Sequence, residues 1–152
     1  MIKTVLEAVT NSPEQTERLG HQLAELLSND SSLPRFIALY GDLGVGKTAF
    51  VRGFVSLFSP AAAVRSPTFA LVNEYPSREC RIFHFDMYRI ADEDDLYSIG
   101  YYDYLDSGIC LVEWSENIPY ALPDSYIRVT VAKTDVSQPD TRSIKIESLT
   151  DD

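Results

Sequence analysis

The hydrophobic residues near the start of the chain recur at helical spacing. Between residues 12 and 30, SPEQTERLGHQLAELLSND, the leucines fall on one face of a helix. These residues are Leu19, Leu23, Leu26 and Leu27. Ser12 is a favourable N-cap, Pro13 suits the first helical position, and Gln15 stands where a capping box places Glu or Gln. The pattern predicts a helix that begins after Ser12.

Two kinds of strand pattern come next. Residues 35–40, RFIALY, form a short apolar run without alternation, which is typical of a central strand buried on both faces of a parallel sheet. A helix from about Lys47 to Phe58 is expected after it. Residues 69–75 and 80–88 alternate between apolar and polar positions on either side of the turn-like PSRE, and this predicts an antiparallel hairpin.

The second half of the chain predicts a short helix followed by three strands. Residues 91–108 are acidic and predict a short helix and loop near the surface. The clustered tyrosines of YYDYLDSG make this stretch a candidate docking surface, with a solvated helix as the alternative. Residues 109–114, ICLVEW, form another continuous apolar strand, and the ranges 125–133 and 142–149 predict two terminal strands with period two.

Composition and charge limit the class of protein and the partners that it can bind. With 45% hydrophobic residues among 152, the chain has enough apolar material for one core, so we expect a single domain over residues 1–152 and a monomer. The net charge of −10 works against nonspecific adhesion to nucleic acid or to an anionic membrane. The N-terminal residues lack the apolar core of a signal peptide and no apolar run approaches membrane-spanning length, which predicts a cytoplasmic protein without membrane contact.

The chain has two cysteines, Cys80 and Cys110. Both fall in segments that predict strands, and they lack the C-x-x-C spacing of metal or redox sites. We therefore expect reduced thiols in the core or at an edge of the sheet.

The motif GDLGVGKT, residues 41–48, fits the phosphate-binding pattern G-x-x-x-x-G-K-[ST] and lies between the predicted strand and helix. Its glycines let backbone N–H groups turn around a phosphate at a helix N-terminus. In that geometry Lys47 reaches the β- and γ-phosphates and the Thr48 hydroxyl binds Mg²⁺. The predicted nucleotide-binding residues here are Gly41, Asp42, Leu43, Gly44, Val45, Gly46, Lys47, Thr48 and Ala49.

The order of the elements around this loop predicts the fold. A strand, the phosphate loop and a helix are followed by a hairpin, a helix, a strand and a terminal strand pair. We expect an α/β protein with a P-loop NTPase-like three-layer fold and a mixed central sheet, partly parallel and partly antiparallel.

A magnesium site also needs an acidic group at the end of a neighbouring strand. Asp86 closes IFHFD and Glu113 closes ICLVE. The run before Glu113 resembles a Walker-B strand more closely, whereas Asp86 lies on the predicted hairpin. An acidic residue at the end of a strand is usually just a solvated loop residue. Beside a phosphate loop, however, both Asp86 and Glu113 are candidate Mg²⁺ ligands, one binding the metal directly and one through water.

Three further residues are weaker candidates. Thr68 in RSPTF stands between the phosphate-loop helix and a strand, where switch segments sense the γ-phosphate, although Ser-Pro-Thr is also a common turn. Arg89 follows Asp86 closely and would stabilise transition-state charge, unless it only solubilises the surface. Trp114 directly follows Glu113, with core or rim packing as the alternative.

Residues 132–135, AKTD, approach the guanine-reading pattern Asn/Thr-Lys-x-Asp. The first position is Ala132, which has no polar side chain, and Asp86 is not followed by the glycine expected in a GTPase switch. The sequence therefore favours ATP over GTP.

Several motifs together resemble one known family. GDLGVGKT, SPTF, NEY, HFDMYR, IGYYDY and LVEWSE occur in the order and at the spacing of the bacterial TsaE family, formerly YjeE. The resemblance covers about residues 36–119. Val45 departs from it, since family members usually have alanine there.

The resemblance implies a P-loop ATPase that is weak alone and acts with the TsaB–TsaD pair in making threonylcarbamoyladenosine next to the anticodon of tRNA. Its cofactors would be ATP and Mg²⁺, and it would meet tRNA only through that complex. Lys47, Thr68, Asp86 and Glu113 would be catalytic; Thr48, Glu113 and Asp86 would serve the metal; and Trp114 would complete the site.

Two other functions remain open from the residues alone. A small-molecule kinase on the same fold usually needs a lid with several arginines, and the sequence shows no Arg-rich insertion after the phosphate loop. A nucleotide-gated binding module would use the same loop without hydrolysis.

Overall fold

The computed structural model describes residues 1–41, 46–67, 71–134 and 137–151, within which seven strands form one sheet in the order β1-β7-β6-β2-β5-β4-β3. The strands are β1 (Ile2–Thr10), β2 (Phe36–Tyr40), β3 (Val72–Tyr75), β4 (Ile82–Asp86), β5 (Ile109–Glu113), β6 (Tyr126–Lys133) and β7 (Arg142–Leu149). The helices are α1 (Pro13–Asn29), α2 (Lys47–Phe58), α3 (Glu93–Ser98) and α4 (Tyr101–Leu105), with 3₁₀ turns η1 (Ser115–Asn117) and η2 (Pro119–Ala121).

The centre of the sheet is parallel and its edges are antiparallel. Strand β2 pairs in parallel with β5 and β6, and β5 pairs in parallel with β4. At the edges, β3 pairs antiparallel with β4, and β7 pairs antiparallel with β6 and β1. The predicted mixed sheet and the predicted hairpin of β3 and β4 are confirmed.

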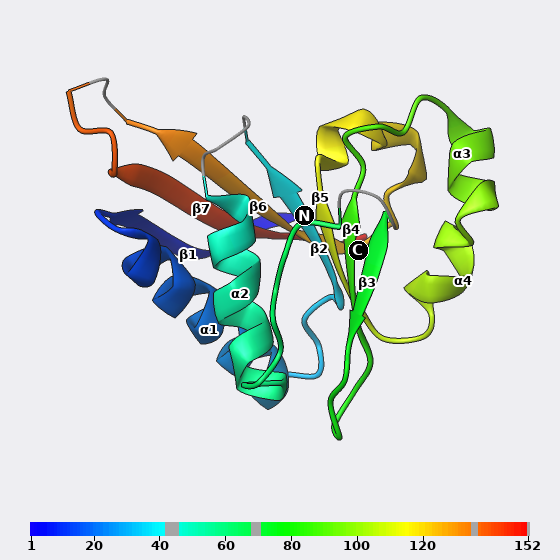
Figure 1. Cartoon of the computed structure of the whole chain (residues 1–152), viewed down its shortest axis with the longest axis horizontal. Helices are drawn as coiled ribbons and strands as arrows, with labels where there is room; N and C mark the ends of the chain where they lie inside the picture. The colour runs from blue at the N-terminus through cyan, green and yellow to red at the C-terminus, as the bar shows by residue number, and fades with distance from the viewer. Residues whose placement is uncertain (42–45, 68–70, 135–136, 152) are drawn as a thin grey trace.

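Side chains alternate between the two faces of the sheet, and each face has its own core. Ile37 and Leu39 of β2 pack with α1 and α2, while Phe36 and Ala38 pack with α3, α4 and the 3₁₀ turns. Figure 1 shows α1 and α2 side by side on one side of the sheet, with α3 and α4 on the other. The all-apolar β2 follows from cover on both faces, and the predicted three-layer α/β fold is confirmed.

The helix boundaries agree well with the residue pattern. Helix α1 begins at Pro13, and the Ser12 hydroxyl accepts a hydrogen bond from the Gln15 backbone N–H at 3.2 Å. The Gln15 side chain accepts from the backbone N–H of Asn11 at 2.7 Å, so the reciprocal bond of the capping box falls one residue early. Helix α2 spans Lys47–Phe58, as predicted.

Three expectations about local structure were wrong. The acidic stretch forms two short helices where one was expected, and although most of its residues are exposed or half-buried, Leu96 and Tyr101 are fully buried, with the Tyr101 hydroxyl donating to the Ala121 carbonyl at 2.9 Å. Cys80 lies in the connection before β4 and not in a strand. Strand β5 ends at Glu113, because Trp114 takes a left-handed backbone conformation with φ 59°.

Helices α1 and α2 approach so closely that a glycine is needed at the contact. A Cβ atom on Gly53 would lie 1.8 Å from the backbone oxygen of Glu17. We expect Gly53→Ala to lower the free energy of unfolding by about 1–3 kcal/mol, because the two helices must separate. This is the net loss expected after the gain of about 1 kcal/mol that alanine brings to a helix.

Urea unfolding of Gly53→Ala measures this effect. Gln22→Ala, on the exposed side of α1, is the control and should change stability little. A Gly53→Ala protein as stable as the parent would contradict the close contact.

The two thiols should differ in reactivity. Cys110 is 1% exposed, and burial raises its pKa to about 12. Burial also raises the pKa of the half-buried Cys80, with a smaller contribution from Glu79. Because the thiolate is the reactive form, a raised pKa lowers reactivity at pH 8.

In labelling with a disulfide reagent at pH 8, we therefore expect slow reaction of Cys80 and none of Cys110 until the protein unfolds. Cys80→Ser should abolish labelling of the folded protein. Rapid labelling of that variant would show that Cys110 is accessible and would contradict its burial.

Candidate nucleotide-binding site

The loop after β2 leads into α2 through glycines with positive φ. Gly41 has φ 142° and Gly46, the N-cap of α2, has φ 106°. A side chain at Gly46 would be strained in this conformation, so the motif's glycine allows the chain to enter the helix. The predicted phosphate-binding residues Asp42, Leu43, Gly44 and Val45 lie outside the described residues.

Lys47 opens α2, and its side chain reaches back to Gly41, just after the end of β2. It is 5% exposed, and its Nζ donates to the Gly41 carbonyl at 2.6 Å. The same Nζ lies 3.6 Å from the centroid of the Trp114 ring, a cation–π contact. The left-handed backbone of Trp114 turns the chain just after β5, where its ring contacts Lys47. Lys47 and Trp114, predicted for one site, are therefore in contact.

Thr48 and Glu113 also meet. Parallel pairing of β2 with β5 sets Glu113 beside Leu39, next to the start of the phosphate loop. The Thr48 hydroxyl donates to Glu113 Oε1 over a long 3.4 Å, and Glu113 is only 4% exposed. A hydroxyl and a buried carboxylate are thus side by side where the sequence predicted a metal.

Asp86 lies at the end of the neighbouring strand. The register pairs Asp86 with Glu113, so the two predicted acids end adjacent parallel strands. Asp86 Oδ2 accepts from the Ser66 hydroxyl at 2.8 Å, and Oδ1 accepts from the Tyr88 backbone N–H at 3.0 Å. Ser66 belongs to the RSPTF segment, whereas Thr68 lies outside the described residues. Arg89, three residues beyond the end of β4, is exposed.

His84 is a residue of this site whose contacts the sequence analysis missed. The fully buried ring of His84 contacts Glu113 Oε2 through Nε2 and the Tyr75 hydroxyl through Nδ1, the latter at 2.9 Å. Period two puts His84 and Asp86 on the same face of β4. That polar pair within an apolar strand was the signal available in the sequence.

The protein groups gathered here suit magnesium. A hydroxyl and two carboxylates offer oxygen atoms, the ligands that Mg²⁺ prefers, and Mg²⁺ commonly completes its shell with phosphate and water. In the described part of the chain, no three His, Cys, Asp or Glu side chains cluster as a metal site of their own. The donor set therefore fits a metal held jointly by the protein and a nucleotide.

A small cavity of about 130 Å³ opens on the other side of the N-terminus of α2. It is lined by Gly46 of the motif and Ala49 just after it, by Ser12 and Thr16 at the start of α1, and by Asp140 and Arg142 just before and at the start of β7. The hydroxyl of Thr10 lies 2.8 Å from that of Thr16. Ala49 therefore lines a cavity that lies between the start of α2 and the start of α1.

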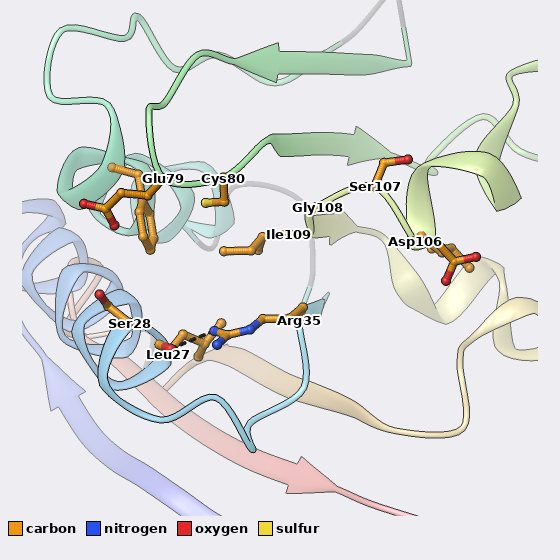
Figure 2. Close-up of a pocket in the computed structure, with 11 residues that line it drawn as sticks. Leu27, Ser28, Arg35, Glu79, Cys80, Asp106, Ser107, Gly108 and Ile109 are labelled. Atoms are coloured by element: carbon orange, nitrogen blue, oxygen red, sulfur yellow. Dashed lines mark hydrogen bonds between the residues drawn. The ribbon is translucent and has the colours of Figure 1, made fainter.

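A different cavity, of about 510 Å³, lies at the opposite end of the parallel strands (Figure 2). Its walls come from residues just before β2 and β5, including Arg35 and Gly108, and from the C-terminal part of α1. The Arg35 guanidinium donates to the Leu27 carbonyl at 2.7 Å there. None of the predicted site residues lines this cavity, so the predicted chemistry gathers at the carboxyl end of the parallel strands.

No helix in the described part of the chain combines the length and apolar character needed to cross a bilayer. In the AKTD pattern, Ala132 and Lys133 end β6, and Asp135 lies outside the described residues.

Comparison with known proteins gives consistent matches. Residues 10–144 match the family model described as threonylcarbamoyl adenosine biosynthesis protein TsaE. The tRNA threonylcarbamoyladenosine biosynthesis protein TsaE of Haemophilus influenzae is 38% identical over 135 residues, which are 88% of this chain and 83% of that protein. The protein of the same name from Bacillus subtilis is 33% identical, over 82% of this chain and 75% of the relative. The crystal structure of Bacillus subtilis YdiB superposes with a TM-score of 0.74 at 27% identity, over 98% of this chain and 88% of that one.

Proposed function

The chain belongs to the TsaE family of tRNA threonylcarbamoyladenosine biosynthesis, and from this premise we propose that it is a cytoplasmic ATPase that drives or resets the TsaB–TsaD complex. A role in that biosynthetic pathway follows from the family. The observation that best supports hydrolysis of Mg-ATP is the contact of the Thr48 hydroxyl with the buried Glu113 carboxylate, beside Lys47.

The residues at the start of α2 would bind the phosphates. Lys47 already has its ammonium group turned toward the loop, 2.6 Å from the Gly41 carbonyl, and would exchange this partner for the β- and γ-phosphate oxygens. The N-terminus of α2 adds a favourable dipole and backbone N–H groups that point toward a bound anion. The Trp114 ring beside Lys47 would limit the positions that the ammonium group can take.

The acids would organise the metal and the reacting phosphate. Thr48 would bind Mg²⁺ through its hydroxyl, and Glu113 and Asp86 would contribute, one directly and one through water. Bound Mg²⁺ would neutralise charge on the β- and γ-phosphate oxygens. Asp86 also accepts a hydrogen bond from Ser66, so the segment leading to Thr68 is tied to the same acid.

The cavity beside Gly46 and Ala49 is the proposed place of the adenine. It lies next to the phosphate loop, and hydroxyl groups of α1 and charged groups near β7 border it. The net charge of −10 agrees with contact to tRNA only through the partner proteins.

Phosphate release by the purified protein tests hydrolysis. We expect slow release from Mg-ATP, little from Mg-GTP, and none with EDTA present. Transfer of the γ-phosphate to a small acceptor without phosphate release would instead identify a kinase. ATP binding with no phosphate release under any condition would leave a binding module and overturn the proposal.

A further inference from the structure

A chain of buried contacts leads from Glu113 to the opposite side of β4. His84 on β4 contacts Glu113 through Nε2 and the Tyr75 hydroxyl of β3 through Nδ1, at 2.9 Å. The Tyr75 hydroxyl also lies 3.3 Å from the Arg65 carbonyl. We propose that His84 is a positioning residue that fixes the Glu113 carboxylate toward Thr48, with Tyr75 fixing the His84 ring in turn. This role rests on the proposed function of the site.

The two oxygens of Glu113 are held from two sides. Oε1 accepts from the Thr48 hydroxyl at 3.4 Å, and Oε2 accepts from His84 Nε2. Rotation of the carboxylate about its last bond would break both contacts. A partner behind a carboxylate in this way orients the oxygen that faces the metal. The long Thr48 contact alone would hold Glu113 only weakly, so His84 carries most of the positioning.

The His84 ring is itself fixed by its environment. It is 0% exposed, and a buried imidazole is costly unless its nitrogens have hydrogen-bond partners. A carboxylate can only accept, so in the neutral imidazole Nε2 carries the hydrogen and Nδ1 accepts from Tyr75. The Tyr75 hydroxyl is closer to Nδ1, at 2.9 Å, than to the Arg65 carbonyl, at 3.3 Å, which favours this assignment.

The same geometry links both acids to one segment. Arg65 contacts the Tyr75 hydroxyl, and the next residue, Ser66, donates to Asp86. Glu113 is therefore connected to Arg65 through the side chains of His84 and Tyr75. Asp86 is connected to Ser66 by a direct hydrogen bond. In the antiparallel pairing of β3 with β4, Asn73 lies opposite His84 and Tyr75 lies opposite Ile82. Tyr75 is therefore the diagonal neighbour of His84 on the same face of the sheet.

The test compares His84→Leu with His84→Gln. Leucine fills a similar volume without a hydrogen-bond donor, whereas glutamine keeps an N–H group that reaches Glu113. Equilibrium ATP binding is followed by the fluorescence of Trp114, the single tryptophan, over a range of Mg²⁺ concentrations. We expect His84→Leu to need about 10–100-fold more Mg²⁺ for half-maximal binding, with binding of metal-free ATP unchanged, and His84→Gln to stay within a few-fold of the parent.

A second measurement uses the protein without nucleotide. Nitrogen-15 NMR should show the hydrogen of the His84 ring on Nε2, with a signal that moves in both Glu113→Gln and Tyr75→Phe. A His84→Leu protein that is less stable but has the parent's Mg²⁺ dependence of ATP binding would show a merely structural role and overturn the proposal. A His84 ring signal that is unchanged in Glu113→Gln would also overturn it. Failure of the parent protein to bind ATP would instead overturn the proposed function. The NMR result would still show whether His84 donates a hydrogen bond to Glu113.

Discussion

Replacing Lys47 by alanine is expected to weaken ATP binding by about 10–100-fold and to reduce hydrolysis below detection. The ammonium group is buried against the Trp114 ring and lies at the loop that would hold the phosphates. A charge-assisted hydrogen bond contributes about 1.5–3 kcal/mol, and about 1.4 kcal/mol corresponds to a factor of ten in affinity. Removing the only side-chain cation of the motif therefore removes about one to two powers of ten.

Fluorescence titration with Mg-ATP and phosphate release measure the two effects. Arg52→Ala is the matched control, because Arg52 is a cation on the same helix that pairs with Glu17 at 2.9 Å on the surface. It should bind and hydrolyse ATP like the parent. A Lys47→Ala protein that binds ATP with parental affinity would contradict the assignment of the phosphate site.

Replacing Glu113 by glutamine is expected to separate binding from hydrolysis. Glutamine has nearly the same shape, and Lys47 and the start of α2 would still bind the phosphates, so at saturating Mg²⁺ the affinity for ATP should change only a few-fold, although more Mg²⁺ should be needed to reach saturation. The neutral amide is a poorer partner for a metal, and we expect kcat to fall about 10–100-fold. Single-turnover phosphate release and equilibrium binding on the same sample measure both quantities.

Glu147→Gln is the control for loss of a buried carboxylate. Glu147 is 8% exposed, pairs with Arg128 at 3.1 Å, and lies on β7 away from the phosphate loop. Its replacement should alter stability and leave kcat unchanged. Full hydrolysis by Glu113→Gln would contradict the proposed role of Glu113. Parental hydrolysis by Glu147→Gln with loss in Glu113→Gln would assign the effect to the site.

The sequence predicted best those elements whose signals are local. Ser12, Pro13 and the phosphate motif act within a few residues of the helices they begin, and the apolar runs of β2 and β5 mark strands covered on both faces. The resemblance to the TsaE family, carried by motifs in a fixed order, is confirmed by the family match. The individual roles of Lys47, Thr48, Asp86 and Glu113 stay predictions that the experiments above test.

What the sequence could not predict depends on contacts between distant residues. The link of His84 to Glu113 arises from the register of β4 with β5, which no local pattern specifies. The burial of Tyr101 depends on how α4 packs against Phe36 and Phe85. Cys80 was expected in a strand because the alternation of apolar and polar residues begins there. Strand β4 begins only at Ile82, which is also the first of its residues that pair with β3.

The most direct test of the central claim is phosphate release from ATP by the purified protein, alone and after addition of a TsaB–TsaD pair, with Lys47→Ala as the inactive control. A slow rate alone that rises strongly with the pair, and stays at background in Lys47→Ala, is the result that the proposed function predicts. Fast hydrolysis by the protein alone, preference for GTP, or a rate that does not respond to the pair would contradict it.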